Sequence, residues 1–255
     1  MLELYHGGPG ANSLKALLPL LEKGLDFRSH LMNLLAFEQH EPWCLRINPN
    51  GQVPVLVHDG RVLTESTVIN EYVDECFPEI PLRPADPYGR AQMRIWTKFV
   101  DEYFCPALSF LGWHAMIRTA VSNLTPEEFE AKVARIPLQE QRDKWRESAA
   151  QVWTAEQLED WRRKVRVSIQ RMEAGLQGPW MLGQQFTLAD VSLFSMLIGM
   201  PDRFADIVNS KDSPRVIDWY ARMTERAGVK AALAIPRPSL QLLQARQREA
   251  AAAGR

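Results

Sequence analysis

The sequence predicts a small α/β domain with a mixed sheet at residues 1–80, followed by an all-helical domain at residues 88–240. Strand patterns occur only before residue 66, whereas long helical patterns fill the chain after residue 88. Between these regions, "PLRPADP" at 81–87 is rich in proline, as linkers between domains commonly are. The fold class is therefore α/β followed by all-α.

The first domain opens with a β-α-β unit. The alternating segment at 2–7 predicts a strand, and "FRSHLMNL" at 27–34 predicts a second one. Between them, leucines at steps of three and four after Ser13 predict a helix that ends at Gly24. Because a helix crosses over between the two strands, we expect these strands to be parallel.

A hairpin and a closing helix complete this domain. A short helix is expected near 41–47, followed by the strands "VPVLVH" at 53–58 and "RVLTE" at 61–65. The Asp-Gly pair between these strands is a strong signal for a hairpin. A helix then runs from Ser66 to Pro78, which gives the order β-α-β-α-β-β-α.

The second domain contains helical patterns only. Its clearest helices are expected at 88–117, 156–176, 187–200 and 213–226. A charged segment at 118–156 lies between the first two, either as a solvated insertion or as a cover for the mouth of a substrate site. The polar, alanine-rich residues 241–255 predict a frayed helix or a tail.

Composition excludes several classes of function. With 30 Lys and Arg against 31 Asp and Glu, the chain has no broad basic field for a nucleic-acid partner. Apolar stretches such as "VSLFSMLIGM" are too short to cross a membrane, and the N-terminus lacks a leader pattern, so we expect a cytoplasmic protein. Cys44, Cys76 and Cys105 lack the spacing of metal ligands or of a redox dithiol, which predicts reduced, mostly structural cysteines and no metal.

Three candidate ligand-binding positions lie at the starts of helices or strands. Ser13 follows a Gly-Pro-rich loop, where it either caps the helix or, with the free N–H groups of that helix, stabilises an anion such as a thiolate. A Val53–Pro54 peptide bond is either cis, which turns the Val53 backbone toward a ligand, or trans at the start of an edge strand. Glu65 and Ser66 either cap a helix or receive the ammonium and carboxylate groups of an amino acid.

These residues, within "NPNGQVPVL" at 48–56 and "LTESTVINEYV" at 63–73, together with "FTLADVSLF" at 186–194, resemble the cytosolic glutathione transferases over nearly the full chain. The resemblance implies a thioredoxin-like first domain and a homodimer. It also implies a glutathione site in which Ser13 holds the sulfur and Val53, before cis Pro54, pairs with the cysteinyl backbone. The γ-glutamyl end would lie at Glu65 and Ser66, and the glycyl carboxylate would be reached by the residues Gln39, His40 and Gln52.

For some residues the resemblance either leaves an alternative open or differs from the usual family pattern. Gln52 stands where serine-type members often have a basic residue, so this contact is neutral here. His40 is otherwise a solvated loop residue. Asp101 resembles an acid that reaches the γ-glutamyl group across a dimer interface in some members, but it also fits an exposed helix acid. Thr187 and Asp190 have the spacing of a capping box and are assigned to folding.

Further stretches, "GPGANSLK", "FEQH", "LRPADP" and "RIWTKFVDEYFC", resemble bacterial β-etherases that cleave lignin-derived β-aryl ethers. That resemblance implies that Asn12 shares the sulfur with Ser13. The glutathione thiolate would displace an aryloxy group next to a ketone, giving a phenol and a thioether. Most aromatic residues of the first long helix are expected in the core, and the candidates for an aryl pocket are Tyr103, Phe110, Trp113, His114 and Met116.

The pKa of a free thiol determines how strongly the start of the helix has to stabilise a bound thiolate. A free thiol has a pKa of about 8.5, and lowering it by about two units requires roughly 2.7 kcal/mol of preferential thiolate stabilisation. Two alternatives to a β-etherase stay open: a general detoxifying transferase, and a transferase-like binding protein without catalysis.

Overall fold

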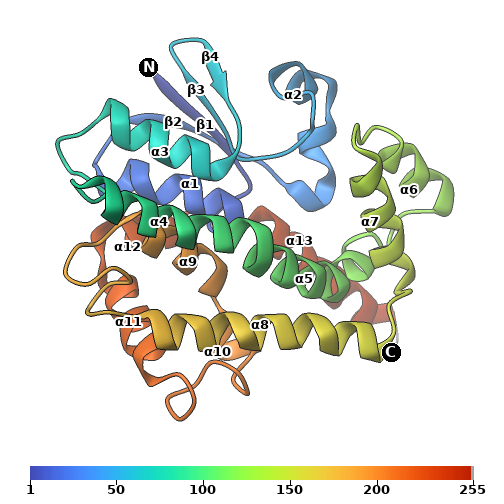
Figure 1. Cartoon of the computed structure of the whole chain (residues 1–255). Coiled ribbons are helices and arrows are strands. Elements are labelled where there is room, and N and C mark those ends of the chain that lie inside the picture. Colours follow the sequence, from blue (N-terminus) through green and yellow to red (C-terminus); the bar gives the residue numbers. More distant parts are fainter. Residues whose placement is uncertain (254–255) are drawn as a thin grey trace.

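The computed structural model describes residues 1–253, in which a four-stranded sheet precedes a larger helical region (Figure 1). The strands are β1 (Leu2–His6), β2 (Phe27–Leu31), β3 (Val55–His58) and β4 (Arg61–Leu63). The helices of this first region are α1 (Ala11–Glu22), α2 (Pro42–Ile47) and α3 (Ser66–Cys76), with the 3₁₀ turns η1 (Leu34–Ala36) and η2 (Glu38–His40) before α2.

The sheet has the predicted topology. Its strand order is β2-β1-β3-β4, with β1 parallel to β2, and β3 antiparallel to both β1 and β4. The order of elements confirms the predicted β-α-β-α-β-β-α pattern, and the Asp-Gly turn joins β3 to β4 as expected. The two 3₁₀ turns were not expected, because three-residue turns leave no periodic pattern in a sequence.

The second region is helical throughout its described residues. Its elements are α4 (Pro87–Phe99), the π-helical turn η3 (Val100–Phe104), α5 (Cys105–Ala120), α6 (Pro126–Val133), α7 (Gln139–Ala150), α8 (Ala155–Gly175), α9 (Leu188–Leu197), α10 (Met200–Arg203), α11 (Pro214–Glu225), α12 (Ala227–Leu233) and α13 (Pro238–Ala253). Within residues 1–253, no helix has the length and apolar character that crossing a membrane would require.

The helix expected at 88–117 is interrupted by the π-helical turn. There the N–H of Cys105 donates to the carbonyl of Val100, five residues earlier. Pro106 follows directly and has no N–H to donate to the carbonyl four residues before it, so a regular α-helical bond is lost at this point. The chain is nevertheless helical from Pro87 to Ala120, so the expected helix is present and the π-helical turn within it is the feature that was not predicted.

Helix α1 lies between the sheet and the helical region (Figure 1). It packs against α3 on one side and against α9 and α12 on the other. All eight residues from Ser13 to Leu20 are buried, as is typical of a helix that is covered on every face.

Helix α9 begins with the predicted capping box. The Asp190 carboxylate accepts hydrogen bonds from the Thr187 N–H at 3.0 Å, the Met181 N–H at 2.8 Å and the Trp219 Nε1–H at 2.8 Å. Desolvation in this fully buried position raises the pKa of Asp190. Because these contacts lie in the core of the helical region, the assignment of Thr187 and Asp190 to folding is confirmed.

The chain after residue 237 forms helix α13, which packs against α5. Leu243 is buried, and the Ser239 hydroxyl donates to Asn33 Oδ1 at 3.3 Å. Most of the expected polar tail at 241–255 is thus helical and docked, because one apolar side chain and contacts at its start fix it to the molecule. Residues 254 and 255 lie outside the described residues.

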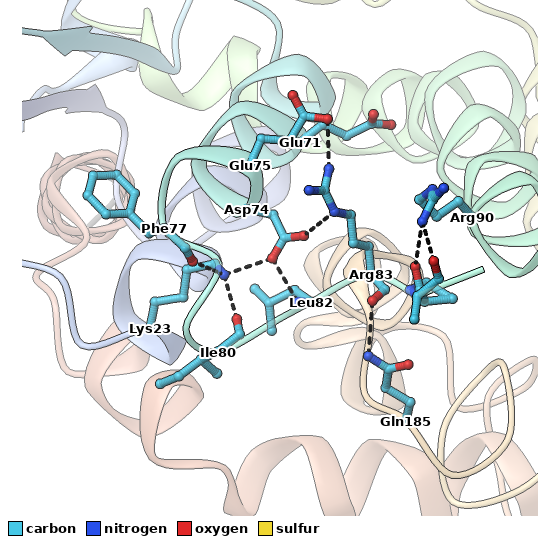
Figure 2. Close-up of polar contacts among 12 residues, drawn as sticks. Lys23, Glu71, Asp74, Glu75, Phe77, Ile80, Leu82, Arg83, Arg90 and Gln185 are labelled. Atoms are coloured by element: carbon cyan, nitrogen blue, oxygen red, sulfur yellow. Dashed lines mark hydrogen bonds and ion pairs between the residues drawn. The ribbon is translucent and has the colours of Figure 1, made fainter. Parts of the chain in front are cut away.

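The segment at 81–87 is tied to the first region by buried polar contacts, and the Arg83 carbonyl accepts a hydrogen bond from Gln185 of the second region at 3.1 Å (Figure 2). Asp74 of α3 pairs with Lys23 Nζ at 2.7 Å and with Arg83 Nε at 3.2 Å, and it accepts the N–H of Leu82 at 2.7 Å. Lys23 also donates to the Phe77 carbonyl at 2.9 Å. The proposal that these residues divide two domains is supported by the last strand on one side and the long helices on the other.

We predict that Asp74→Ala lowers the free energy of unfolding by about 3 to 5 kcal/mol, because it leaves the buried Lys23 ammonium without its counter-charge. Urea unfolding measures this change. The matched control is Glu75→Ala, which removes an exposed partner of Arg83 and should cost less than about 1 kcal/mol. Equal losses in the two variants would contradict the role of the buried pair.

Candidate active site

A cavity of about 850 Å³ opens between the two regions. One wall comes from the loop before α1, the turn before β3 and the first residues of α3, and the opposite wall comes from α5, α7, α9 and α10. The start of α1 lies where the two walls meet.

The loop that leads into α1 is shaped by close packing. Gly8 has φ +95°, and a Cβ atom there would lie 3.0 Å from the carbonyl oxygen of Pro236. A Cβ atom on Gly7 would overlap the side chain of Leu34. The buried His6 ring accepts the Gly8 N–H at Nδ1, at 3.1 Å, and its Nε2 contacts Ser29 Oγ at 2.7 Å. These contacts hold the loop in one path, which glycine alone can follow at these positions.

Ser13 is the third residue of α1, and Gly10 is the N-cap. Ser13 therefore does not cap this helix, and the alternative that it is a helix cap was wrong. Its hydroxyl oxygen accepts the Gly7 N–H at 2.9 Å, so the hydroxyl hydrogen stays available to donate into the cavity. The first bond within the helix runs from Leu14 N–H to the Gly10 carbonyl, which leaves the N–H groups of Ala11 and Asn12 and of Ser13 itself without helical partners.

Asn12 lies beside Ser13 in the cavity wall. Its Oδ1 faces the Cys105 sulfur at 3.9 Å, and its amide nitrogen forms no hydrogen bond within the described structure. Together, the Asn12 amide, the Ser13 hydroxyl and the positive end of the α1 dipole form an arrangement suited to a small anion. Burial raises the pKa of the Cys105 thiol itself, so this neighbouring sulfur stays protonated.

The turn before β3 contributes Gln52, Val53 and Pro54 to the wall. The Val53–Pro54 peptide bond is cis, as the resemblance implied. Asn48 donates its side-chain N–H to the Gln52 carbonyl at 2.8 Å and holds the turn, while the Gln52 side chain itself is exposed.

Glu65 and Ser66 line the same cavity at the start of α3. Glu65 has φ 66° and ψ 108°, an unusual conformation for a residue with a side chain, and no side chain caps the helix. Backbone strain of this kind typically persists where surrounding contacts hold a functional group in place. The capping alternative for these two residues is therefore wrong, and their positions agree with a polar ligand at the helix start.

Gln39 and His40 are buried in the cavity wall, with exposed fractions of 7% and 4%. The Gln39 amide nitrogen donates to the Leu34 carbonyl at 3.3 Å and to His40 Nε2 at 3.1 Å, so His40 carries its hydrogen on Nδ1. His40 Nδ1 and Gln39 Oε1 are buried atoms without hydrogen-bond partners. Desolvation, with a smaller contribution from Arg135, lowers the pKa of His40 to about 4. The alternative of a solvated histidine was wrong.

Asp101 lies outside the cavity wall, in the π-helical turn. Its carboxylate pairs with the buried ammonium of Lys15 in α1 and accepts the Thr67 hydroxyl of α3 at 2.6 Å. Thr67 directly follows Ser66. Asp101 is exposed, in agreement with the alternative of an exposed helix acid, and within one chain its carboxylate also ties α1 to the start of α3.

Of the five residues expected in an aryl pocket, Trp113 and Met116 line the cavity. Tyr103 instead stacks on Phe99 with ring centroids 5.6 Å apart, and Phe110 stacks on Trp161 at 4.2 Å. His114 packs against Trp153 at 5.7 Å. Phe110 and His114 lie on the opposite face of α5 from its cavity-lining residues, and Tyr103 precedes α5 in the π-helical turn.

Helix α7 forms part of the cavity wall, although none of its residues was predicted to lie in the site. Gln141, Lys144 and Trp145 all line the cavity, and Trp145 stacks on Phe37 at 4.1 Å. The segment at 118–156 is thus part of the site, in agreement with its suggested role as a cover. No local sequence pattern could have predicted this wall, because its contacts join segments that lie far apart in the chain.

Two family models match the chain. The glutathione S-transferase N-terminal domain matches residues 1–75, and the glutathione S-transferase C-terminal domain matches residues 127–235. Among curated proteins, Protein LigF of Sphingobium sp. is 44% identical over 236 residues, which is 90% of this chain and 91% of that protein. Glutathione S-transferase U19 of Arabidopsis thaliana is 24% identical over 233 residues, with 89% and 87% coverage.

Solved structures give the same relationship. The crystal structure of the β-etherase LigF from Sphingobium sp. strain SYK-6 has a TM-score of 0.87 and 43% identity, covering 91% of this chain and 98% of that one. A glutathione transferase homologue from Sulfitobacter, crystallised with bound glutathione, has a TM-score of 0.66 and 26% identity over 91% and 96% of the two chains.

We predict that protonation of two buried histidines destabilises the fold between pH 6.5 and 4. Burial lowers the pKa of both His6 and His40 from 6.5 to about 4, so in this window the unfolded chain binds protons that the folded chain does not. The free energy of unfolding should fall by roughly 5 kcal/mol, summed over the two histidines, as the pH decreases through this window.

Urea unfolding at several pH values tests this prediction in the wild type and in a His6→Asn, His40→Asn double variant. The variant should be less stable at pH 7 but should lose less stability on acidification. Parallel pH curves for the two proteins would contradict the assignment to these histidines.

Proposed function

The chain belongs to the glutathione S-transferase family, and we propose that it is an enzyme that uses glutathione to cleave β-aryl ethers of lignin-derived aromatic ketones. The observation that carries this proposal is the start of α1, where Asn12 and Ser13 face a cavity large enough for an aryl substrate. The near full-length similarity to the β-etherase LigF supports the substrate class.

Glutathione fits the first wall of the cavity as the second substrate. Glu65 and the start of α3 at Ser66 offer a carboxylate and free N–H groups to the γ-glutamyl end. The buried Nδ1–H of His40 has no partner in the described structure and would donate to the glycyl carboxylate, with Gln39 and Gln52 beside it. Val53 would pair with the cysteinyl backbone.

In the proposed reaction, the sulfur of glutathione bonds to the carbon next to the ketone, and the bond from that carbon to the aryloxy oxygen breaks. The electron pair leaves with the oxygen, so the products are a glutathione thioether and a phenol. Ser13 and Asn12 would hold the sulfur as a thiolate, and both walls would align the three reacting atoms. Direct displacement inverts the carbon centre, so one enantiomer should react preferentially.

Trp113, Met116 and Trp145 would provide the apolar surface for the aryl rings. Tyr103, Phe110 and His114 would not contact the aryl rings and would support this surface by packing on neighbouring aromatic residues. Lys144 stands among these aromatic residues, with its Nζ 4.5 Å from the Trp113 ring centroid.

We also propose a homodimer and a cytoplasmic location. Val68 of α3 and Ile95 of α4 are large apolar side chains with exposed fractions of 54% and 48%, and Asp101 lies close to α3, so this side of the molecule would suit a second copy. The three free cysteines are compatible with a reducing compartment.

The deciding experiment incubates the protein and glutathione with each enantiomer of a β-aryloxy ketone and follows phenol and thioether. Release of both products from one enantiomer supports the proposal. Conjugation of chlorodinitrobenzene without ether cleavage would favour a general detoxifying transferase. Absence of glutathione binding by calorimetry would instead favour a binding protein without this chemistry.

We predict that Ser13→Ala and Asn12→Ala each raise the pKa of the bound thiol by about one to two units and slow ether cleavage about 10- to 100-fold. Each variant removes one donor to a charged sulfur, which is worth roughly 1.5 to 3 kcal/mol. Thiolate absorbance during a pH titration measures the pKa. Ser122→Ala, on an exposed turn, is the matched control. An unchanged pKa in both variants would assign the thiolate to the backbone N–H groups.

A further inference from the structure

The wall formed by α7 holds a cation that the reaction above does not use. Lys144 Nζ donates to Ser109 Oγ at 2.6 Å and lies over the rings of Trp113 and Phe110, 4.5 and 5.1 Å from their centroids. Within the described residues, Lys144 forms no ion pair with a carboxylate. Desolvation lowers its pKa to about 8, so it is charged at neutral pH but less strongly basic than usual.

The other cations of this wall differ from Lys144. Arg162 pairs with Asp206 at 2.6 Å, and Arg203 is exposed on α10. Among these three, Lys144 is the cation that is both partly buried and balanced only by aromatic faces and a hydroxyl. Such a site favours an anion, because a partly buried charge without a counter-charge gains most from one.

The position of Lys144 relative to the sulfur site follows from α5. Cys105 faces Asn12, which would hold the sulfur, and Ser109, which binds Lys144, lies four residues further along the same helix. Four residues span about one helical turn, or roughly 6 Å. The anion site at α1 and the Lys144 ammonium therefore line the same cavity, and they contact positions of α5 that are about one helical turn apart.

We propose that Lys144 is a catalytic acid that protonates the phenolic oxygen as it leaves. This inference rests on the proposed ether cleavage. As the sulfur–carbon bond forms and the carbon–oxygen bond breaks, the electron pair goes to the aryloxy oxygen, which takes a proton from the Lys144 ammonium. The neutral amine then regains a proton from water.

Proton transfer in this direction is favourable. A phenol has a pKa of about 10, so a phenolate takes a proton from an ammonium of pKa about 8 with an equilibrium advantage of about a hundredfold. Ser109 accepts one Lys144 hydrogen and thereby orients the ammonium, which has two further hydrogens for the substrate.

The test compares two β-aryloxy ketones, one that releases a methoxyphenol and one that releases a nitrophenol, in the wild type and in Lys144→Met. A nitrophenolate is a stable anion and needs no proton. We expect Lys144→Met to lower kcat for the methoxyphenyl ether about a hundredfold and to change kcat for the nitrophenyl ether less than about threefold. The nitrophenyl ether thus also reports whether the variant folds.

The matched control is Lys164→Met, which removes a lysine that also lies over a tryptophan ring, at 3.8 Å from Trp161, but outside the cavity wall. It should leave both rates unchanged. Equal losses for the two ethers in Lys144→Met, or no loss for either, would overturn the role of Lys144. If the wild type released no phenol from either ether, the proposed function would fail and the inference with it.

Discussion

Burial of α1 on every face is the constraint on which the site depends. Because Ser13 to Leu20 are buried, in a core shared with the sheet and under α3, α9 and α12, only the first residues of this helix can reach the cavity. The unpaired N–H groups of those residues are therefore the polar groups that the fold exposes at this point. The tight glycine loop and the neutral His6 ring follow from the same crowding, since they bring the chain to the helix start without a side chain in the way.

Two buried lysines fix α1 along its length. Lys15 pairs with Asp101 of the helical region and donates to Thr67 of α3 at 2.8 Å, and Lys23 pairs with Asp74 of α3. Removing either acid leaves a charge in a place that water does not reach, which makes the position of α1 costly to change. Because Thr67 adjoins Ser66, the same contacts that place the sulfur site also place the site for the γ-glutamyl end. The two ends of the proposed glutathione site are therefore positioned by one set of ion pairs.

The sequence allowed prediction of features that local patterns encode. The strands, the Asp-Gly hairpin and the Thr187–Asp190 capping box each depend on residues within a few positions of one another. The aromatic pocket did not follow from the sequence, because the face of α5 that meets the cavity is set by packing against α7 and α8, which lie further along the chain. Trp113 thus faces the cavity, while Phe110 faces Trp161. The buried state of His40 likewise depends on packing of distant segments around Phe37, which no local pattern reveals.

Helix α7 connects the two halves of the proposed reaction. Trp145 stacks on Phe37, three residues before His40, and so supports the loop that would hold the glycyl end of glutathione. Lys144, the adjacent residue, faces the aromatic part of the cavity. Displacement moves negative charge from the sulfur to the departing oxygen, and a site that stabilised the thiolate alone would make the nucleophile less reactive. In the proposed reaction, the Lys144 ammonium would offset this loss of reactivity, because it would stabilise the negative charge that develops on the departing aryloxy oxygen. In the proposed reaction, α7 would thus supply the positive group that the start of α1 by itself lacks for an ether substrate.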